Sequence, residues 1–291
     1  MKNDMKLDKV IFGDNQFFAV NHLSDEKSRQ QAIRFKTDSS IIKVLDDAID
    51  LGINSFMCTT HDRIANICEH IRLNPEKYTN FKILPGMPYA HKYANSMTEL
   101  GIVGTIQQYV PGNIFSTFAK GGFAFLSKDF GKLMEILVDA EMKMFKGINT
   151  PVIFIQNVVA DMILGLRMYD IFAEYDAYVR KKYNAEPGYI TMNMPMMLDA
   201  LNSVGVKNPI ICSSINKIGF RMSGGKAIYE KYLEEKEFRP IAMQVLAAGA
   251  LRPKEAIEYL GQFSRIESVL FGASSKGHTQ ETQELIEKSL K

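Results

Sequence analysis

The feature that most constrains the fold of this chain is a repeated alternation of a short apolar run with a longer amphipathic segment. The short runs are rich in β-branched residues and methionine and lack polar alternation, as expected of strands buried on both faces. Eight such runs occur, at 9–12, 53–58, 82–87, 152–156, 189–193, 209–212, 240–244 and 268–272. This alternation predicts a parallel sheet with helical connections.

The segments between these runs place apolar residues at helical spacing. One of them, 40–51, is followed by Gly52, a residue typical of the position just after a helix. The other predicted helices are 64–71, 97–109, 129–144, 162–182, 198–204, 226–235, 253–263 and 279–291. Eight strands, each followed by a helix, are the pattern of a single α/β domain over residues 1–291, a (β/α)8 TIM barrel.

A doubly wound sheet is the alternative fold. It would be favoured by a glycine-rich GxGxxG loop after the first strand, but Gly13 is followed by Asp14, Asn15 and Gln16. The barrel therefore remains the better prediction.

Charge and cysteine content exclude several classes of protein. The formal net charge is +2, which gives no overall field for binding nucleic acid or an anionic membrane. The three cysteines are too few and too widely spaced for a disulfide framework. The first nine residues are charged and lack the apolar core of a signal peptide, and the most apolar stretch, 151–166, contains polar residues. We expect a cytoplasmic protein.

One segment does not fit the repeat. Residues 111–127 read PGNIFSTFAKGGFAFLS and combine four phenylalanines with glycines, within an insertion at 111–130 between strands three and four. A long loop of this kind predicts either a lid over the active site or a packed insertion that contacts another subunit of a homo-oligomer.

Polar residues gather where the predicted strands end, and these ends meet at one mouth of a barrel. The candidate catalytic residues there are Asp14, Cys58, His61, Asp62, Arg63 and His91. A thiolate at Cys58 beside His61 and Arg63 would have a lowered pKa, whereas a packed, inert thiol is the simpler reading. Asp62 would then cap a helix. A metal site could use Asp14, His22, His61, Asp62 and His91, but no motif supports it, so none is predicted.

Lys217 is a second kind of candidate. It follows the sixth strand, where class I aldolases commonly place a Schiff-base lysine, although it lies beyond the strand rather than in it. A surface lysine is the simpler interpretation of the same residue.

From Pro187 onward the sequence resembles the aldo-keto reductases. Four segments match that family in the correct order: TMNMP at 191–195, NPIICS at 208–213, IAMQVLAAGAL at 241–251 and IESVLFGASS at 266–275. The resemblance implies a barrel that binds NADP. The residues implied to bind the cofactor are Asn193, Ser213, Gln244, Gly272, Ser274 and Ser275.

The catalytic tetrad of that family is not matched. Cys58 and Arg63 stand where the resemblance would put an aspartate and the proton-donating tyrosine, the third strand ends without a lysine, and the fourth ends in Gln156 and Asn157 instead of a histidine. Met243 replaces the tyrosine that stacks on the nicotinamide. The resemblance therefore supports the fold and not the reaction.

Three functions follow from these observations. The first is an enzyme for a small anionic or phosphorylated carbonyl or polyol compound, with NAD(P)-linked oxidoreduction as the reaction implied by the resemblance. The second is a lyase or isomerase that uses a Schiff base at Lys217. The third is a barrel without catalytic activity that binds a ligand or partner through the phenylalanine-rich insertion.

Overall fold

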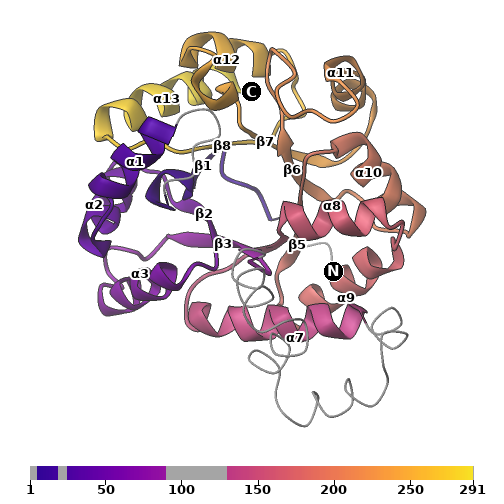
Figure 1. Ribbon diagram of the computed structural model, residues 1–291, viewed down its shortest axis with the longest axis horizontal. Coiled ribbons are helices and arrows are strands. Elements are labelled where there is room, and N and C mark those ends of the chain that lie inside the picture. The colour runs from indigo at the N-terminus through magenta and orange to yellow at the C-terminus, as the bar shows by residue number, and fades with distance from the viewer. Residues whose placement is uncertain (1–4, 19–24, 90–129, 291) are drawn as a thin grey trace.

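The computed structural model describes residues 5–18, 25–89 and 130–290, in which eight parallel strands close into a barrel in chain order. Figure 1 shows the strands at the centre and the helices around them. The strands are β1 (Val10–Gly13), β2 (Ser55–Thr59), β3 (Lys82–Met87), β4 (Val152–Ile155), β5 (Glu186–Thr191), β6 (Ile210–Ser214), β7 (Arg239–Met243) and β8 (Ser268–Phe271). The predicted (β/α)8 fold is confirmed, with strand limits shifted by at most a few residues.

The described helices occupy most of the predicted segments. They are α1 (Asp25–Arg34), α2 (Asp38–Asp50), α3 (Asp62–Leu73), α7 (Phe130–Met142), α8 (Asn157–Gly165), α9 (Asp170–Tyr183), α10 (Met194–Ser203), α11 (Lys226–Glu235), α12 (Pro253–Leu260) and α13 (Lys276–Ser289). Three short 3-10 helices, η1 (Asn15–Phe18), η2 (Lys143–Phe145) and η3 (Ala247–Gly249), complete the set.

Two helix predictions need correction. The segment 162–182 is two helices rather than one, because the chain turns at Arg167, whose φ of 56° is left-handed and cannot continue a right-handed helix. Helix α1 was not predicted, since its sequence is almost wholly polar. The predicted helix 97–109 and the insertion at 111–130, apart from Phe130 at the start of α7, lie outside the described residues.

The end of α2 shows why the sequence prediction worked there. The N–H of Gly52 donates to the carbonyl of Ile49, and the N–H of Ile53 donates to that of Ala48. Gly52 has a φ of 85°, which glycine adopts without the steric cost of a side chain. The glycine therefore ends the helix and directs the chain into β2.

Side chains on the two faces of the strands form separate cores. One set points into the barrel and includes Ile11, Leu84, Phe154 and Ile241, while the other packs against the surrounding helices. Phe154 fills the barrel because its neighbour across the β4–β5 pair is Gly188; a Cβ there would lie 2.3 Å from the phenylalanine ring. Such packed layers make the barrel interior a core and not a pore.

Ionic contacts lie at the amino ends of the strands. The Asp8 carboxylate accepts hydrogen bonds from Ser55 Oγ at 2.6 Å and from Lys82 Nζ at 2.9 Å. Arg239 similarly pairs with Glu267 at 2.9 Å. Among the described helices, none is both long and apolar enough to cross a membrane.

Candidate functional site

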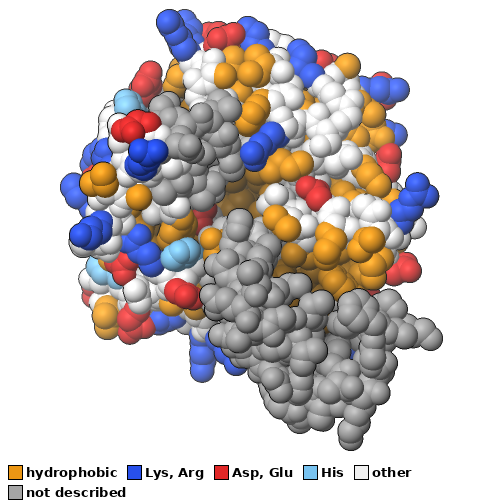
Figure 2. All heavy atoms as spheres, viewed as in Figure 1, with side chains coloured by type: hydrophobic (Ala, Val, Ile, Leu, Met, Phe, Trp, Pro, Cys, Tyr) orange, Lys and Arg blue, Asp and Glu red, His pale blue; other side chains and the backbone are white. Residues whose placement is uncertain are grey.

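A cavity of about 530 Å³ opens where the strands end at their carboxyl termini. The molecular surface is hollowed near the centre of the face shown in Figure 2. The cavity is lined by residues from the ends of several strands and from the loops after them, which is where barrel enzymes place their active sites. Its polar lining residues are Asp14, Asn15, Gln16, Thr59, Tyr89, Gln156, Asn157, Arg221 and Gln244.

Asp14 is the buried acid of this cavity, with 7% of its surface exposed. Its Oδ2 accepts hydrogen bonds from the backbone N–H of Thr59 at 2.7 Å and from the Thr59 hydroxyl at 2.8 Å. Burial raises the pKa of the Asp14 carboxyl, and the bonds from Thr59 oppose that rise in part. A carboxyl with a raised pKa at the floor of a cavity is suited to holding and transferring a proton.

Tyr89 brings a phenol to the same cavity from just beyond β3. Burial raises its pKa, and the charges of Asp14 and Asp62 add to that rise, so the hydroxyl keeps its proton. The backbone N–H of Tyr89 donates to the carboxylate of Glu141 in α7, at 3.1 Å from each oxygen. Glu141 also accepts a hydrogen bond from the hydroxyl of Thr60. One buried carboxylate therefore fixes the chain after both β2 and β3.

A similar contact fixes the end of β5. Asp161 in α8 accepts hydrogen bonds from the hydroxyl of Thr191 and, at 3.1 Å, from the backbone N–H of Met192. Burial raises the pKa of Asp161. Met192 lies next in the chain and lines the cavity. The polar side chains behind the strand ends thus hold the cavity wall in place.

The loop after β7 has unusual backbone geometry. Gln244, Ala247 and Ala248 have φ values of 52°, 46° and 58°, and Gly249 has 98°. Left-handed residues other than glycine cost conformational energy and concentrate at functional sites. Gln244 Oε1 accepts a hydrogen bond from Ser214 Oγ at 2.7 Å, which joins the ends of β6 and β7. The strained loop is therefore held against the cavity.

The surroundings of Cys58 contradict the hypothesis that it is an activated thiolate. It lines the cavity but is only 2% exposed. Burial raises its pKa well above the ordinary value, and the nearby Asp14 charge raises it further. The predicted lowering by His61 and Arg63 fails because Cys58 is withdrawn from solvent and lies beside an acid. The packed, inert thiol is the reading that fits.

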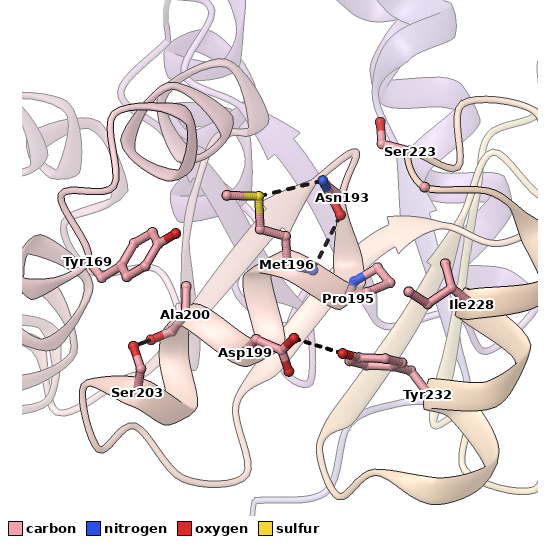
Figure 3. A pocket seen from close by; sticks show the side chains of 11 residues that line it. Tyr169, Asn193, Pro195, Met196, Asp199, Ala200, Ser203, Ser223, Ile228 and Tyr232 are labelled. Carbon is pink, nitrogen blue, oxygen red and sulfur yellow. Dashed lines mark hydrogen bonds between the residues drawn. The ribbon is translucent and has the colours of Figure 1, made fainter.

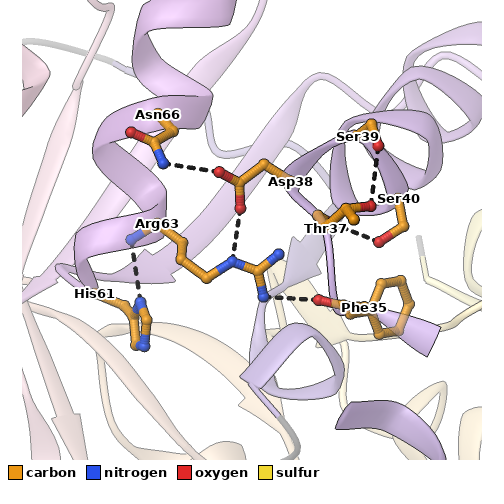
Figure 4. Close-up of polar contacts among 8 residues, drawn as sticks. All are labelled: Phe35, Thr37, Asp38, Ser39, Ser40, His61, Arg63 and Asn66. Carbon is orange, nitrogen blue, oxygen red and sulfur yellow. Dashed lines mark hydrogen bonds and ion pairs between the residues drawn. The ribbon is translucent and has the colours of Figure 1, made fainter. Parts of the chain in front are cut away.

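His61, Asp62 and Arg63 follow β2 but are not among the residues that line the cavity. As Figure 4 shows, Arg63 Nε donates to Asp38 at 2.6 Å and Arg63 Nη1 donates to the Phe35 carbonyl at 2.7 Å. The expected convergence of Arg63 on the mouth is therefore wrong, because Asp38 attracts its side chain toward α2. His61 accepts from the Arg63 N–H at 3.1 Å and caps α3, where Asp62 was expected to do so.

His61 nevertheless lies close to the mouth. Its ring stacks on Phe18, a lining residue, with centroids 4.2 Å apart. Asp62 is the first residue of α3. His91 lies outside the described residues.

Lys217 does not reach the cavity. Its Nζ pairs with Glu255 at 2.6 Å, and its side chain is 49% exposed. The Schiff-base prediction required a lysine desolvated inside the mouth, so this position contradicts it.

Among the described residues, no group of three histidine, cysteine or acidic side chains is arranged to hold a metal ion.

The residues implied to bind a cofactor are divided between locations. Gln244 and Gly272 line the cavity. Ser213 uses its hydroxyl to donate to the Thr191 carbonyl at 2.8 Å and is fully buried. Asn193 caps α10 and lines a separate groove of about 420 Å³ between α10 and α11, shown in Figure 3. Asn193 and Ser213 are thus not brought to the mouth.

Ser274 and Ser275 lie in the turn before α13. The Ser274 carbonyl accepts a hydrogen bond from the guanidinium of Arg34. Ser275 caps α13, since its Oγ accepts from the His278 N–H at 3.4 Å. Gly272 precedes them and lies against Gln16; a Cβ at Gly272 would be 2.0 Å from Gln16 Oε1. A side chain at Gly272 would therefore require Gln16 to move where the loops after β1 and β8 meet.

Sequence reasoning did not identify Glu141 or Arg221 as site residues. Glu141 carried a usable signal, because it falls on the buried face of α7 with Met134 and Val138, where an acid needs a partner. Arg221 carried none, since its place at the mouth depends on the path of the long loop between β6 and α11. Tyr89 follows the third strand in the sequence, but nothing in the sequence distinguishes it from the other polar residues there.

Among known proteins, solved structures share the fold of this chain. No protein-family model and no curated protein matches the chain. An aldo-keto reductase from Pseudomonas aeruginosa is similar in structure, with a TM-score of 0.61 and 11% identity over 100% of this chain and 93% of that one. A thermostable aldo-keto reductase solved with the inhibitor epalrestat gives a TM-score of 0.57 and 10% identity, over 100% of this chain and 93% of that one.

An aldo-keto reductase from Brucella melitensis gives a TM-score of 0.51 and 8% identity, over 97% of this chain and 90% of that one. The chain therefore has the barrel fold of the aldo-keto reductases, as the sequence resemblance implied.

Proposed function

We propose that the protein is an NAD(P)-linked oxidoreductase that acts on a small carbonyl or polyol compound in the barrel mouth. The observation that carries this proposal is Asp14, a buried carboxyl with a raised pKa that lines the cavity at the carboxyl ends of the strands. Active sites are where acids with raised pKa values and open cavities occur together. The barrel fold of the structural neighbours agrees with this class of reaction.

Asp14 and Tyr89 divide the proton chemistry in this proposal. Reduction of a carbonyl needs a proton on the oxygen as the carbon is reduced, and a positioned acid contributes roughly 10²–10⁴-fold to such a step. Asp14 gives that proton, because burial raises the pKa of its carboxyl and so favours the acid form. Tyr89 stays protonated and donates a hydrogen bond to the same oxygen. In the oxidative direction, Asp14 takes the proton from the alcohol.

The residues on the β7 and β8 side of the cavity fit a dinucleotide. The loop after β7 lines the cavity with Gln244, Ala248 and Gly249, and their left-handed backbone sets its path beside the space that a phosphate would occupy. Gly272 lines the cavity in the next loop, and Arg34 adds a positive charge beside Ser274. When bound, the nicotinamide supplies the hydride. Met243 would give its ring an apolar contact in place of an aromatic one.

Loss of that aromatic ring predicts weaker cofactor binding than an aromatic residue would give. A stacked aromatic pair is worth about 0.5–1.5 kcal/mol, or up to about tenfold in affinity. The position of Lys217 does not support the alternative of a lysine-dependent lyase, since Lys217 is exposed and paired with Glu255.

Calorimetric titration with NADPH and NADH tests the cofactor, and turnover of a panel of small aldehydes, ketones and polyols tests the reaction. We expect micromolar binding of one cofactor, and a loss of turnover of about 10²-fold or more in Asp14→Asn with cofactor binding retained. Asp170→Asn, an exposed acid at the start of α9, is the matched control and should be unaffected. Absence of binding by either cofactor would contradict the oxidoreductase proposal and favour a barrel that only binds a ligand.

A further inference from the structure

The cavity contains a basic side chain that the proton chemistry does not use. Arg221 lies in the loop between β6 and α11, and among the residues described as lining the cavity it is the one lysine or arginine. Its guanidinium carbon lies 5.5 Å from the centre of the Phe220 ring. Asp14 is the acidic residue among those described as lining the cavity, but its side chain is buried.

The loop that carries Arg221 is built to hold one conformation. Buried Asn216 brackets the backbone of Phe220, donating to its carbonyl at 2.8 Å and accepting from its N–H at 2.8 Å. Met222, the next residue after Arg221, is 5% exposed, and the N–H of Ser223 donates to the Met192 carbonyl at 3.0 Å. The residues on both sides of Arg221 are thus fixed to the barrel.

Arg221 itself is left-handed, with a φ of 54°. A residue with a large side chain adopts this conformation at an energetic cost, and the surrounding contacts must impose it. That cost is maintained at the edge of the cavity, which Arg221 lines.

The two lysines nearest to Arg221 in the chain each form an ion pair with an acid. Lys217 pairs with Glu255 at 2.6 Å, and Lys226 pairs with Glu230 at 3.2 Å. Arg221 makes no ion pair with an acid in the described part of the chain. A guanidinium without an acid partner at a cavity is suited to a planar, two-point contact with a carboxylate or a phosphate.

We propose that Arg221 binds an anionic group of the substrate, a carboxylate or a phosphate, so that the substrate class is small carbonyl or hydroxy compounds that carry a negative charge. This inference rests on the proposed function for the location of the substrate, but the anion site stands on its own geometry. Arg221 is a specificity-determining residue, and the reacting oxygen lies at the other end of the substrate, beside Asp14 and Tyr89.

The structure offers a matched control. Arg167 is also an exposed, left-handed arginine, with a φ of 56°, but it lies in the turn between α8 and α9 and does not line the cavity. Arg221→Gln and Arg167→Gln therefore make the same side-chain change in the same backbone conformation. A melting temperature equal to that of the wild type in each variant would show that the fold is retained in both.

Binding of malonate and of inorganic phosphate to the full chain, measured by calorimetry, tests the anion site without requiring turnover. We expect millimolar binding of at least one probe, weakened at least about tenfold in Arg221→Gln and unchanged in Arg167→Gln. The stronger probe identifies the anion as carboxylate or phosphate. Failure of the wild type to bind either probe up to 50 mM, or equal binding by wild type and Arg221→Gln, would overturn the proposal.

A parallel titration with NADPH and NADH separates this inference from the proposed function. Anion binding that depends on Arg221, without binding of either cofactor, would leave the anion site standing and remove the oxidoreductase. If turnover is found, the ratio of kcat/KM for an anionic carbonyl over a neutral one should fall at least about tenfold in Arg221→Gln, mainly through KM. An unchanged ratio would contradict the role of Arg221.

Discussion

Replacing Thr59 with valine removes one of the two hydrogen bonds that Thr59 donates to the Asp14 carboxylate. The hydroxyl bond is 2.8 Å long, and the backbone bond of 2.7 Å is retained in the variant. A hydrogen bond to a charged group contributes about 1.5–3 kcal/mol to stability, and a bond between neutral groups about 0.5–1.5 kcal/mol. The cost of Thr59→Val should therefore depend on whether Asp14 is ionised.

The direction of this pH dependence follows from the pKa of Asp14. Burial raises that pKa in the folded protein, so folding favours the protonated form and stability falls as pH rises between the unfolded and the folded pKa. The bonds from Thr59 lower the pKa, so losing one raises it further and makes that fall larger. We expect a cost of about 1.5–3 kcal/mol at high pH, where Asp14 is ionised, and about 1 kcal/mol less at low pH.

Urea unfolding at a series of pH values measures this cost. Thr79→Val is the matched control, because the Thr79 hydroxyl lies 3.1 Å from the Pro75 carbonyl and 2.9 Å from that of Glu76, two acceptors that do not titrate. Its cost should be the same at every pH. If Thr59→Val also has a cost that does not vary with pH, the Thr59 hydroxyl does not support a charged Asp14 and our account of that carboxyl is wrong.

Three further predictions concern the support of the mouth, the packing inside the barrel and the reactivity of the cysteines. Glu141→Ala should lower the free energy of unfolding by about 2–5 kcal/mol, because it leaves two donors at the ends of β2 and β3 without their acceptor. Glu141→Gln should lower that free energy by less, and equal losses for the two variants in urea unfolding would contradict this interpretation. Gly188→Ala should destabilise the barrel by about 1–3 kcal/mol, because the added methyl group clashes with Phe154. Gly165→Ala should not destabilise it, since the space around Gly165 is open, and similar melting temperatures for the two variants would contradict the packing described. The three cysteines are buried, and burial raises the pKa of Cys68 to about 12. A thiol reagent should therefore label none of them quickly in the native protein and all three in urea. Rapid labelling of one thiol in the native protein would refute this prediction.

The sequence by itself determined the elements of the fold. Strands buried on both faces appear as apolar runs without alternation, and Gly52 marks the end of a helix through its left-handed backbone. These signals are local, so they are legible one segment at a time. The prediction of one helix over 162–182 failed because the left-handed residue at the turn is Arg167 rather than a glycine, while Gly165 just before it is the last residue of α8.

The sequence also determined that polar residues follow the strands, because in a parallel barrel every strand ends at the same face. Of the residues that it singled out, Asp14, Gln244 and Gly272 line the cavity. It did not determine which way each side chain turns. Arg63 and Lys217 stand as close to a strand end in the chain as lining residues do, yet each is drawn away by an acid on another element.

Only the tertiary structure decided the chemistry of the mouth. The raised pKa of Asp14, the inert state of Cys58 and the fixing of Tyr89 by Glu141 all depend on burial and on partners far apart in the chain. Arg221 reaches the cavity because Asn216 and Met222 fix a loop of unpredictable path. Electrostatic character arises from distances and solvent exclusion, and these are properties of the closed barrel rather than of any local stretch of sequence.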